Sequence, residues 1–225
     1  MQQQNGPGGK KTRVLVVDDH PIVRQGLTLL IDGERDLTVC GEAEEAQGAM
    51  QQIPVCRPDI LIVDISLNGP DGLELLKGIR LSYPNLPVLI LSMHDESIYA
   101  ERALRAGANG YIMKQEATEK VLVALRRILN REIYVSERIA NKMLKHYIGG
   151  AAGTHSPMAD LTDRELEVFR LIGEGHGTRQ IAEELHLSVK TVESYQAHIK
   201  EKLSLHNARQ LVQHAIQWSI REKSA

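Results

Sequence analysis

Five side chains capable of chemistry stand at the ends of short apolar runs in the first half of the chain. Asp18 and Asp19 follow one run, Asp64 closes another, and Ser92 and Lys114 close two more. In a parallel sheet the C-terminal ends of the strands lie along one edge, so these residues would converge. Three carboxylates there would repel one another and favour protonation unless a divalent cation compensated them. Taken singly, Asp18 or Lys114 is best explained as an ordinary solvated charge, and Ser92 alone indicates nothing; the signal is their placement at successive strand ends.

Magnesium suits such a cluster because it is a hard cation that prefers oxygen ligands, commonly one or two carboxylates with waters and phosphate oxygens. Lys114 adds positive charge, which would help Asp64 to stay ionised although an apolar strand carries it. An ionised carboxylate beside a bound cation is placed as a nucleophile toward phosphorus. The pattern therefore predicts a phosphoryl acceptor at Asp64 with Mg²⁺ as cofactor.

The elements that must position these residues alternate between apolar runs and amphipathic stretches. Strands rich in Val, Ile and Leu, with helices between them, indicate a parallel sheet covered on both faces. We expect an α/β, doubly wound, flavodoxin-like sheet of five strands. The intervening helices are expected near residues 21–32, 44–53, 71–83, 95–106 and 117–130.

Composition and charge describe a two-domain globular protein. The chain has 225 residues, 42% hydrophobic and 25% charged, and a net charge of −2, which argues against bulk polyanion binding. A polar N-terminus without a signal sequence, two cysteines and the lack of a long apolar run favour a cytoplasmic protein that does not contact membranes. We expect a disordered tail (1–11), a first domain (12–130), a linker with a connecting helix (131–160) and an all-α domain (161–222).

The segments VVDDH, VDIS, LSMHD and GYIMK resemble the receiver domain of bacterial two-component response regulators. This resemblance implies that Asp64 accepts a phosphoryl group from a histidine kinase or phosphotransfer protein. It also implies that Lys114 and Ser92 bind phosphoryl oxygens and that Tyr111 turns inward when the hydroxyl shifts. The implied metal ligands are Asp18, Asp19, Asp64 and the backbone carbonyl of Ser66.

Four positions depart from the receiver pattern or tune it. Asn68 stands where many receivers have proline, so the loop after Asp64 is expected to differ in shape. Met93 is bulkier than the small residue usual after the hydroxyl and would restrict access to the phosphoryl group. Ser66 and His94 occupy positions expected to influence phosphoryl lifetime.

The second half shows the spacing of a helix-turn-helix. Thr162 and Glu165 have the spacing of a capping box at the start of a helix. A short helix near 178–185, a tight turn and a helix near 189–203 follow. On a helical wheel the last of these buries Val192, Ile199 and Leu203 and turns a polar face outward. DNA binding and a plain helical bundle are both compatible with that spacing.

The stretch from Leu161 to Leu203 closely resembles the LuxR-type helix-turn-helix of the NarL/FixJ response regulators. The resemblance implies a recognition helix near 188–203, in which Glu193, Ser194 and Ala197 meet bases. The other candidate DNA contacts are Thr178, Ser188, Lys190, Thr191, His198, Lys200 and Lys202. With so few basic residues, binding to double-stranded DNA is expected to need a homodimer on paired half-sites, formed on phosphorylation.

The predicted function is a transcriptional regulator switched by phosphorylation. One alternative is a phospho-switched module whose helices bind protein. Another is an aspartyl-phosphate phosphatase, but such enzymes usually have a second Asp where Ser66 stands, so we do not expect an enzyme. A final helix near 207–219, with Leu211, Ile216 and Trp218, serves either as a dimer element or as domain core.

Overall fold

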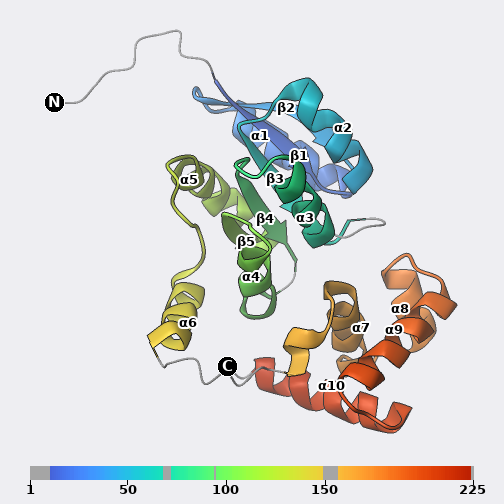
Figure 1. The fold of residues 1–225 in the computed structure, drawn as a ribbon. Coiled ribbons are helices and arrows are strands. Elements are labelled where there is room, and N and C mark those ends of the chain that lie inside the picture. Colours follow the sequence, from blue (N-terminus) through green and yellow to red (C-terminus); the bar gives the residue numbers. More distant parts are fainter. Residues whose placement is uncertain (1–10, 68–71, 94, 149–156, 224–225) are drawn as a thin grey trace. The chain divides into compact units, whose positions relative to one another are not determined.

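The structure is a computed structural model that describes residues 11–67, 72–93, 95–148 and 157–223 (Figure 1). Its internal contacts divide the chain into two compact units, Met1–Ile148 and Gly149–Ala225. The expected N-terminal tail, apart from Lys11, lies outside the described residues, and so do residues 149–156 of the expected linker.

The first unit is built on a parallel sheet in the order β2-β1-β3-β4-β5. This is the strand order of a doubly wound, flavodoxin-like fold, and it confirms the predicted fold class. The order reverses between β1 and β3, so the ends of these two strands flank the crevice where such sheets bind ligands. The strands are β1 (Thr12–Val17), β2 (Leu37–Ala43), β3 (Ile60–Asp64), β4 (Val88–Ser92) and β5 (Gly110–Met113).

Helices cover both faces of this sheet (Figure 1). On one face α1 and α5 pack against alternate strand residues such as Val16, Ile62 and Leu91, all at most 1% exposed. The other face carries α2, α3 and α4. The helices are α1 (Pro21–Asp32), α2 (Ala46–Cys56), α3 (Gly72–Ser82), α4 (Glu96–Arg105) and α5 (Ala117–Leu129), with a short 3-10 turn, η1 (Lys114–Glu116), before α5.

Helix α2 runs three residues beyond its expected end at residue 53, although Pro54 falls inside its last turn. A proline there removes one amide donor from the helix. The helix ends at Arg57, which adopts the left-handed conformation with φ 44° and donates its amide to the Ile53 carbonyl.

The two cysteines, Cys40 and Cys56, are free thiols, and burial together with Cys56 raises the pKa of Cys40 to about 12.

The chain after α5 stays with the first unit instead of leaving at residue 130, where we placed the start of the linker. Tyr134 pairs with the outer edge of β5: the Tyr111 amide donates to the Tyr134 carbonyl at 2.8 Å, and the Tyr134 amide donates to the Asn109 carbonyl at 3.0 Å. This contact was not predictable from the sequence, because a single bridging residue has no periodicity.

Helix α6 (Glu137–Ile148), the expected connecting helix, packs on α4. Ile139 is buried between them at 2% exposure. The Ser136 hydroxyl lies 2.7 Å from the Glu96 carboxylate, and the Arg138 guanidinium lies within 3.3 Å of Glu96 and Asp95. The end of the first unit is thereby tied to the first turn of α4, directly after the loop that follows Ser92.

The second unit is all helical, as predicted. It contains a 3-10 turn, η2 (Pro157–Asp160), and the helices α7 (Asp163–Gly173), α8 (Thr178–Glu184), α9 (Val189–Lys202) and α10 (Ala208–Lys223). The expected capping box is present at the start of α7. Leu211 is 3% exposed and Trp218 packs on Phe169 with ring centroids 5.6 Å apart, so both belong to the core of this unit, whereas Ile216 is 40% exposed.

Candidate functional site

The structure brings the chemically capable residues of the first unit together at the C-terminal edge of the sheet. Asp64 and Ser92 are the last residues of β3 and β4, Asp18 directly follows β1, and Lys114 directly follows β5. Asp18 and Asp64 are each 1% exposed, and Ser92 is fully buried. The convergence expected from strand–helix alternation is therefore real, and it places two buried carboxylates side by side.

Lys114 is the cation that compensates these carboxylates. Its ammonium nitrogen lies 2.7 Å from Asp18 Oδ2 and 2.7 Å from Asp64 Oδ2. Burial by itself would lower the pKa of Lys114, but the Asp64 and Asp18 carboxylates outweigh it and raise that pKa. Lys114 therefore stays charged throughout the physiological range.

Asp64 is held in a setting that opposes its ionisation. Burial raises the pKa of Asp64; Lys114 lowers it, while the neighbouring Asp18 raises it again. The Ser66 amide donates to Asp64 Oδ1 at 3.2 Å, which favours the ionised form. One ammonium group does not fully offset the effect of burial and of a second carboxylate on the pKa of Asp64. Additional positive charge in the pocket would therefore stabilise the ionised form of Asp64.

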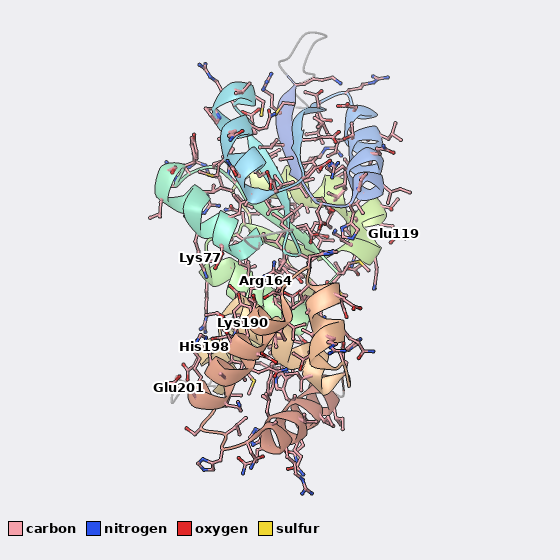
Figure 2. All side chains as sticks on the ribbon, turned by 90° about the vertical axis from the view of Figure 1, so that its right-hand side faces the viewer. Lys77, Glu119, Arg164, Lys190, His198 and Glu201 are labelled. Atoms are coloured by element: carbon pink, nitrogen blue, oxygen red, sulfur yellow. The ribbon has the colours of Figure 1, made fainter. Side chains whose placement is uncertain are left out.

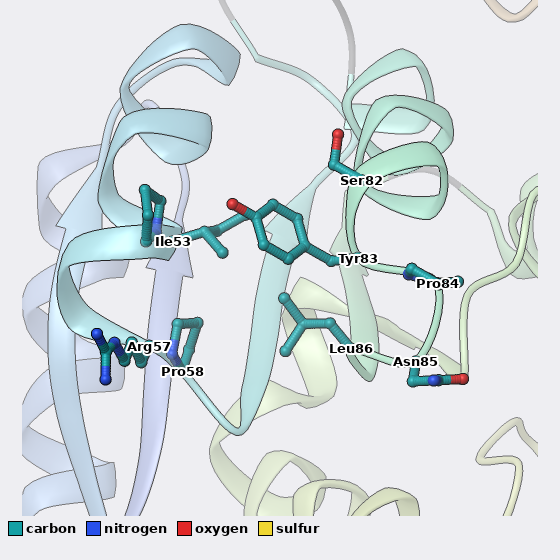
Figure 3. Close-up of a pocket in the computed structure, with 9 residues that line it drawn as sticks. Ile53, Arg57, Pro58, Ser82, Tyr83, Pro84, Asn85 and Leu86 are labelled. Atoms are coloured by element: carbon teal, nitrogen blue, oxygen red, sulfur yellow. The ribbon is translucent and has the colours of Figure 1, made fainter.

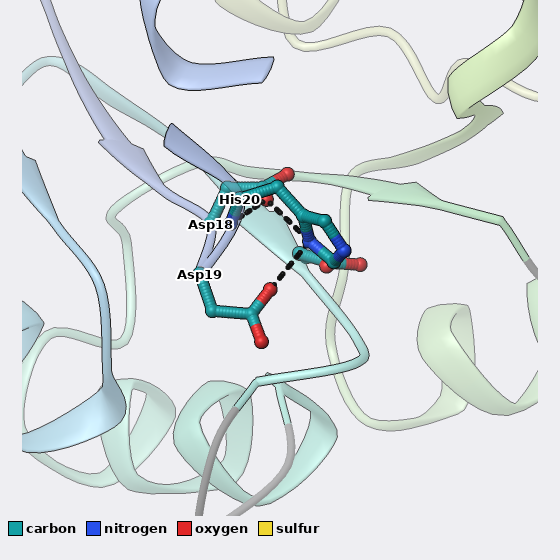
Figure 4. A group of neighbouring side chains, drawn as sticks. Asp18, Asp19 and His20 are labelled. Atoms are coloured by element: carbon teal, nitrogen blue, oxygen red, sulfur yellow. Dashed lines mark hydrogen bonds and ion pairs between the residues drawn. The ribbon is translucent and has the colours of Figure 1, made fainter. Parts of the chain in front are cut away.

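A metal ion would supply that charge. Asp18, Asp19, His20 and Asp64 each offer a ligand atom, and these atoms lie within 4.8 Å of one another. Figure 4 shows the His20 ring turned toward both neighbouring carboxylates, with Nδ1 at 2.6 Å from Asp19 Oδ1 and 3.3 Å from Asp18 Oδ1. The oxygen-rich donor set fits a hard divalent cation such as Mg²⁺.

His20 is a member of the cluster that sequence reasoning missed. Its signal was its position directly after Asp18 and Asp19, where a turn leads into α1.

Ser66, whose carbonyl we expected as a ligand, is half-buried two residues beyond Asp64. Tyr111, which we expect to act with Ser92 as a switch, is 1% exposed; burial raises its pKa, and a hydrogen bond with Ser92 lowers it.

The positions that depart from the receiver pattern are only partly described. The Met93 side chain is 57% exposed beside the site. Asn68 and His94 lie outside the described residues. The access and loop-shape expectations therefore stay predictions.

A pocket of about 620 Å³ lies in the first unit, between the end of α2 and the segment from α3 to β4 (Figure 3). Its lining includes Ile53, Arg57, Tyr83 and Leu86. Residues 57 and 86 precede β3 and β4, so the pocket lies at the N-terminal edge of the sheet. It is separate from the acidic cluster, which occupies the opposite edge.

In the second unit, α9 buries the stripe that the helical wheel predicted. Val192 and Ile199 are fully buried, and Leu203 is partly buried. Lys190, His198 and Glu201 follow the exposed side of the helix (Figure 2). The other expected contacts with exposed side chains are Ser188, Glu193, Ser194, Ala197 and Lys202, while Thr178, Thr191 and Lys200 are half-buried.

Several of these side chains already have partners that fix the helix-turn-helix. The Ser188 hydroxyl caps α9 by accepting the Thr191 amide at 3.0 Å. Thr178 accepts a hydrogen bond from Gln196 at 3.2 Å, which joins α8 to α9. Lys202 lies 2.6 Å from Glu165; burial would raise the pKa of Glu165, but Lys202 and Thr162 lower it. Lys190, close to the start of α9, is exposed.

Two family comparisons match the two units separately. Residues 14–126 match the family described as response regulator receiver domain, and residues 159–215 match the bacterial regulatory proteins of the luxR family. Within the described ranges, none of the helices combines the length and hydrophobicity needed to cross a bilayer.

Individual proteins match either nearly the whole chain or a large part of it. The oxygen regulatory protein NreC of Staphylococcus aureus is 34% identical over 215 residues, which cover 93% of this chain and 99% of NreC. The structure of RcsB from Salmonella enterica serovar Typhimurium, bound to promoter rprA with the phosphomimetic BeF3−, is 28% identical, covers 92% of this chain and 98% of RcsB, and has a TM-score of 0.60. A LuxR-family response regulator from Aurantimonas sp. is 34% identical over 62% of this chain and 99% of its own, with a TM-score of 0.57.

Proposed function

The chain belongs to the response regulators that join a receiver domain to a LuxR-type DNA-binding domain, and we propose that phosphorylation of Asp64 controls its binding to DNA. The observation that carries this proposal is the placement of Asp64. Its carboxylate is buried at the end of β3, 2.7 Å from Lys114 and within 4.8 Å of a ligand atom from each of Asp18, Asp19 and His20.

In the proposed reaction a carboxylate oxygen of Asp64 attacks phosphorus in a phosphohistidine of a histidine kinase or phosphotransfer protein. The new O–P bond forms as the N–P bond to the imidazole breaks. Lys114 would then pair with a phosphoryl oxygen. Mg²⁺, when bound, would offset the charge on the phosphoryl oxygens. The ligands would be Asp18, Asp19, Asp64 and the backbone carbonyl of Ser66.

The response of the first unit would run through Ser92 and Tyr111. A phosphoryl group at Asp64 adds strong acceptor oxygens at the end of β3. Ser92, at the end of the neighbouring strand β4, can donate to one of them. That donation would replace or redirect the hydrogen bond between Ser92 and Tyr111. The switch would thus have two states, one with Ser92 bonded to Tyr111 and one with Ser92 bonded to the phosphoryl group.

In the second unit α9 would enter the major groove of double-stranded DNA. Glu193, Ser194 and Ala197 would face bases, and Lys190 would hold a phosphate. A homodimer, formed on phosphorylation, would give the affinity that one weakly charged unit lacks. The exposed Ile216 on α10 supports a contact between copies. We place the protein in the cytoplasm and assign it a regulatory role, with no substrate turnover.

Asp64→Asn and Asp59→Asn form the matched test pair, because Asp59 precedes the same strand and is exposed at its other end. Each variant is incubated with acetyl phosphate and MgCl2, and intact mass reports phosphorylation. We expect one added phosphoryl group on the wild type and on Asp59→Asn, and none on Asp64→Asn. Equal labelling of all three would overturn the assignment of Asp64.

Gel shifts on the upstream region of the chain's own operon test the link to DNA. Phosphorylation should tighten binding. Lys190→Ala should weaken it similarly on all sequences and reduce the salt slope by about 1 per site. Lys77→Ala, which removes an exposed lysine of α3, is the control. Phosphorylation without any effect on DNA binding would instead favour a module whose helices bind protein.

A further inference from the structure

Arg24 is a buried arginine in the first unit, and the receiver resemblance assigned it no role. It lies on the face of α1 that packs on the sheet, in line with Leu27 and Ile31, and is 7% exposed. A charged group in that position is unfavourable unless several polar partners compensate it. A charge within an otherwise apolar stripe is also the signal by which the sequence could have pointed to this residue.

The partners of Arg24 lie on two other elements. Its Nη1 donates to the backbone carbonyl of Asp18 at 2.6 Å. Its Nη2 pairs with Glu44 Oε1 at 2.5 Å, and its Nε lies 3.4 Å from Glu42 Oε2. One guanidinium thus joins α1 to the end of β1 and to the end of β2.

The Asp18 carbonyl is the important acceptor among these. It belongs to the turn that carries Asp18, Asp19 and His20, three of the four residues in the acidic cluster. The same turn is fixed from the other side, because the His20 amide donates to Asp18 Oδ1 at 2.9 Å. The bond from Arg24 restrains the Asp18 peptide and with it the backbone that carries both aspartate side chains.

We propose that Arg24 is a positioning residue for the cation site: by holding the Asp18 carbonyl it preorganises Asp18 and Asp19 for a divalent cation, without touching the cation or Asp64. The proposal rests on the proposed function for the identity of the cation. Groups that orient metal ligands typically change metal affinity by about 10- to 100-fold when they are removed. The planar fork of arginine donates to the Asp18 carbonyl and to Glu44 and lies 3.4 Å from Glu42, a fixed geometry that the point charge of a lysine ammonium does not reproduce.

The test compares Arg24→Met and Arg24→Lys with Arg126→Met in the full-length protein. Arg126 of α5 also bonds two carboxylates, those of Glu34 and Asp36, neither of which belongs to the acidic cluster. Titration calorimetry with MgCl2 alone gives the cation affinity, and urea unfolding gives stability. We expect Arg24→Met to weaken Mg²⁺ binding about 10-fold or more, Arg24→Lys to restore part of it, and Arg126→Met to leave it unchanged.

A folded Arg24→Met that binds Mg²⁺ as tightly as the wild type would overturn the proposal. Should Arg24→Met fail to fold, Glu44→Gln replaces it, because this change weakens the ion pair that helps to hold the Arg24 guanidinium in place. Unchanged Mg²⁺ affinity in a folded Glu44→Gln would then count against the proposal. Phosphorylation by acetyl phosphate separates the two hypotheses: a wild type that binds Mg²⁺ but takes up no phosphoryl group contradicts the proposed function and leaves the role of Arg24 standing.

Discussion

Replacement of Lys114 by methionine should destabilise the first unit strongly in the absence of Mg²⁺. The Lys114 side chain is 7% exposed and the Asp18 and Asp64 side chains are 2% and 1% exposed, so loss of the ammonium group leaves two buried carboxylates without their cation. Removal of one partner from a buried ion pair typically lowers the free energy of unfolding by about 3 to 5 kcal/mol. Lys120→Met, which breaks a half-exposed pair with Glu116, should lower it by less than about 1 kcal/mol.

The sign of the pH dependence follows from Asp64. Burial already raises its pKa above the unfolded value, and loss of Lys114 raises that pKa further. Below the pKa that Asp64 has in the unfolded chain, Asp64 is protonated in both states, so its burial costs the folded state least there. The folded state loses stability as the pH rises through the pKa that Asp64 has in the folded state. The deficit of Lys114→Met should therefore be small near pH 4 and grow toward neutrality.

Urea unfolding followed by circular dichroism measures this deficit, with and without MgCl2. Saturation with a ligand at 100 times its dissociation constant stabilises the folded state by about 2.7 kcal/mol, so Mg²⁺ should restore much of the loss. Trp218 is the only tryptophan and lies in the second unit, so its fluorescence transition serves as an internal control that should not move. A deficit that is absent, or that shrinks as the pH rises, would refute the assignment of Lys114 as the compensating cation.

Three further substitutions test other contacts. Thr162→Ala should lower the stability of the second unit by about 1 kcal/mol, because it removes the cap of α7; an unchanged urea midpoint of Trp218 fluorescence would contradict this. His186→Gly should raise the free energy of unfolding of the second unit by about 0.5 to 1 kcal/mol, and with it the same urea midpoint, because residue 186 has φ 53°, which glycine adopts without strain. A lower midpoint would argue against strain there. Arg138→Met removes the ion pairs of α6 with α4 and should speed amide hydrogen exchange in α6; exchange as slow as in the wild type would show that apolar packing alone holds the helix.

The sequence was sufficient for those parts of the fold that depend on periodicity. Alternating apolar runs predicted the sheet, and the ends of those runs predicted where Asp64 and Lys114 would meet. Contacts that depend on a single side chain were not predictable in this way. Arg24 bonds a carbonyl that any residue at position 18 would offer, and Tyr134 pairs through its backbone, so periodicity identifies the partner of neither residue.

The pairing of Tyr134 with β5 also has a consequence for how the first unit can be isolated. An unpaired strand edge is a template for aggregation, and here the segment after α5 occupies part of that edge. A fragment cut at residue 130 would expose the Tyr111 amide and strip α6 from α4. A fragment that ends after residue 148 keeps Tyr134 on β5 and α6 on α4. It should remain monodisperse at concentrations where the shorter fragment self-associates.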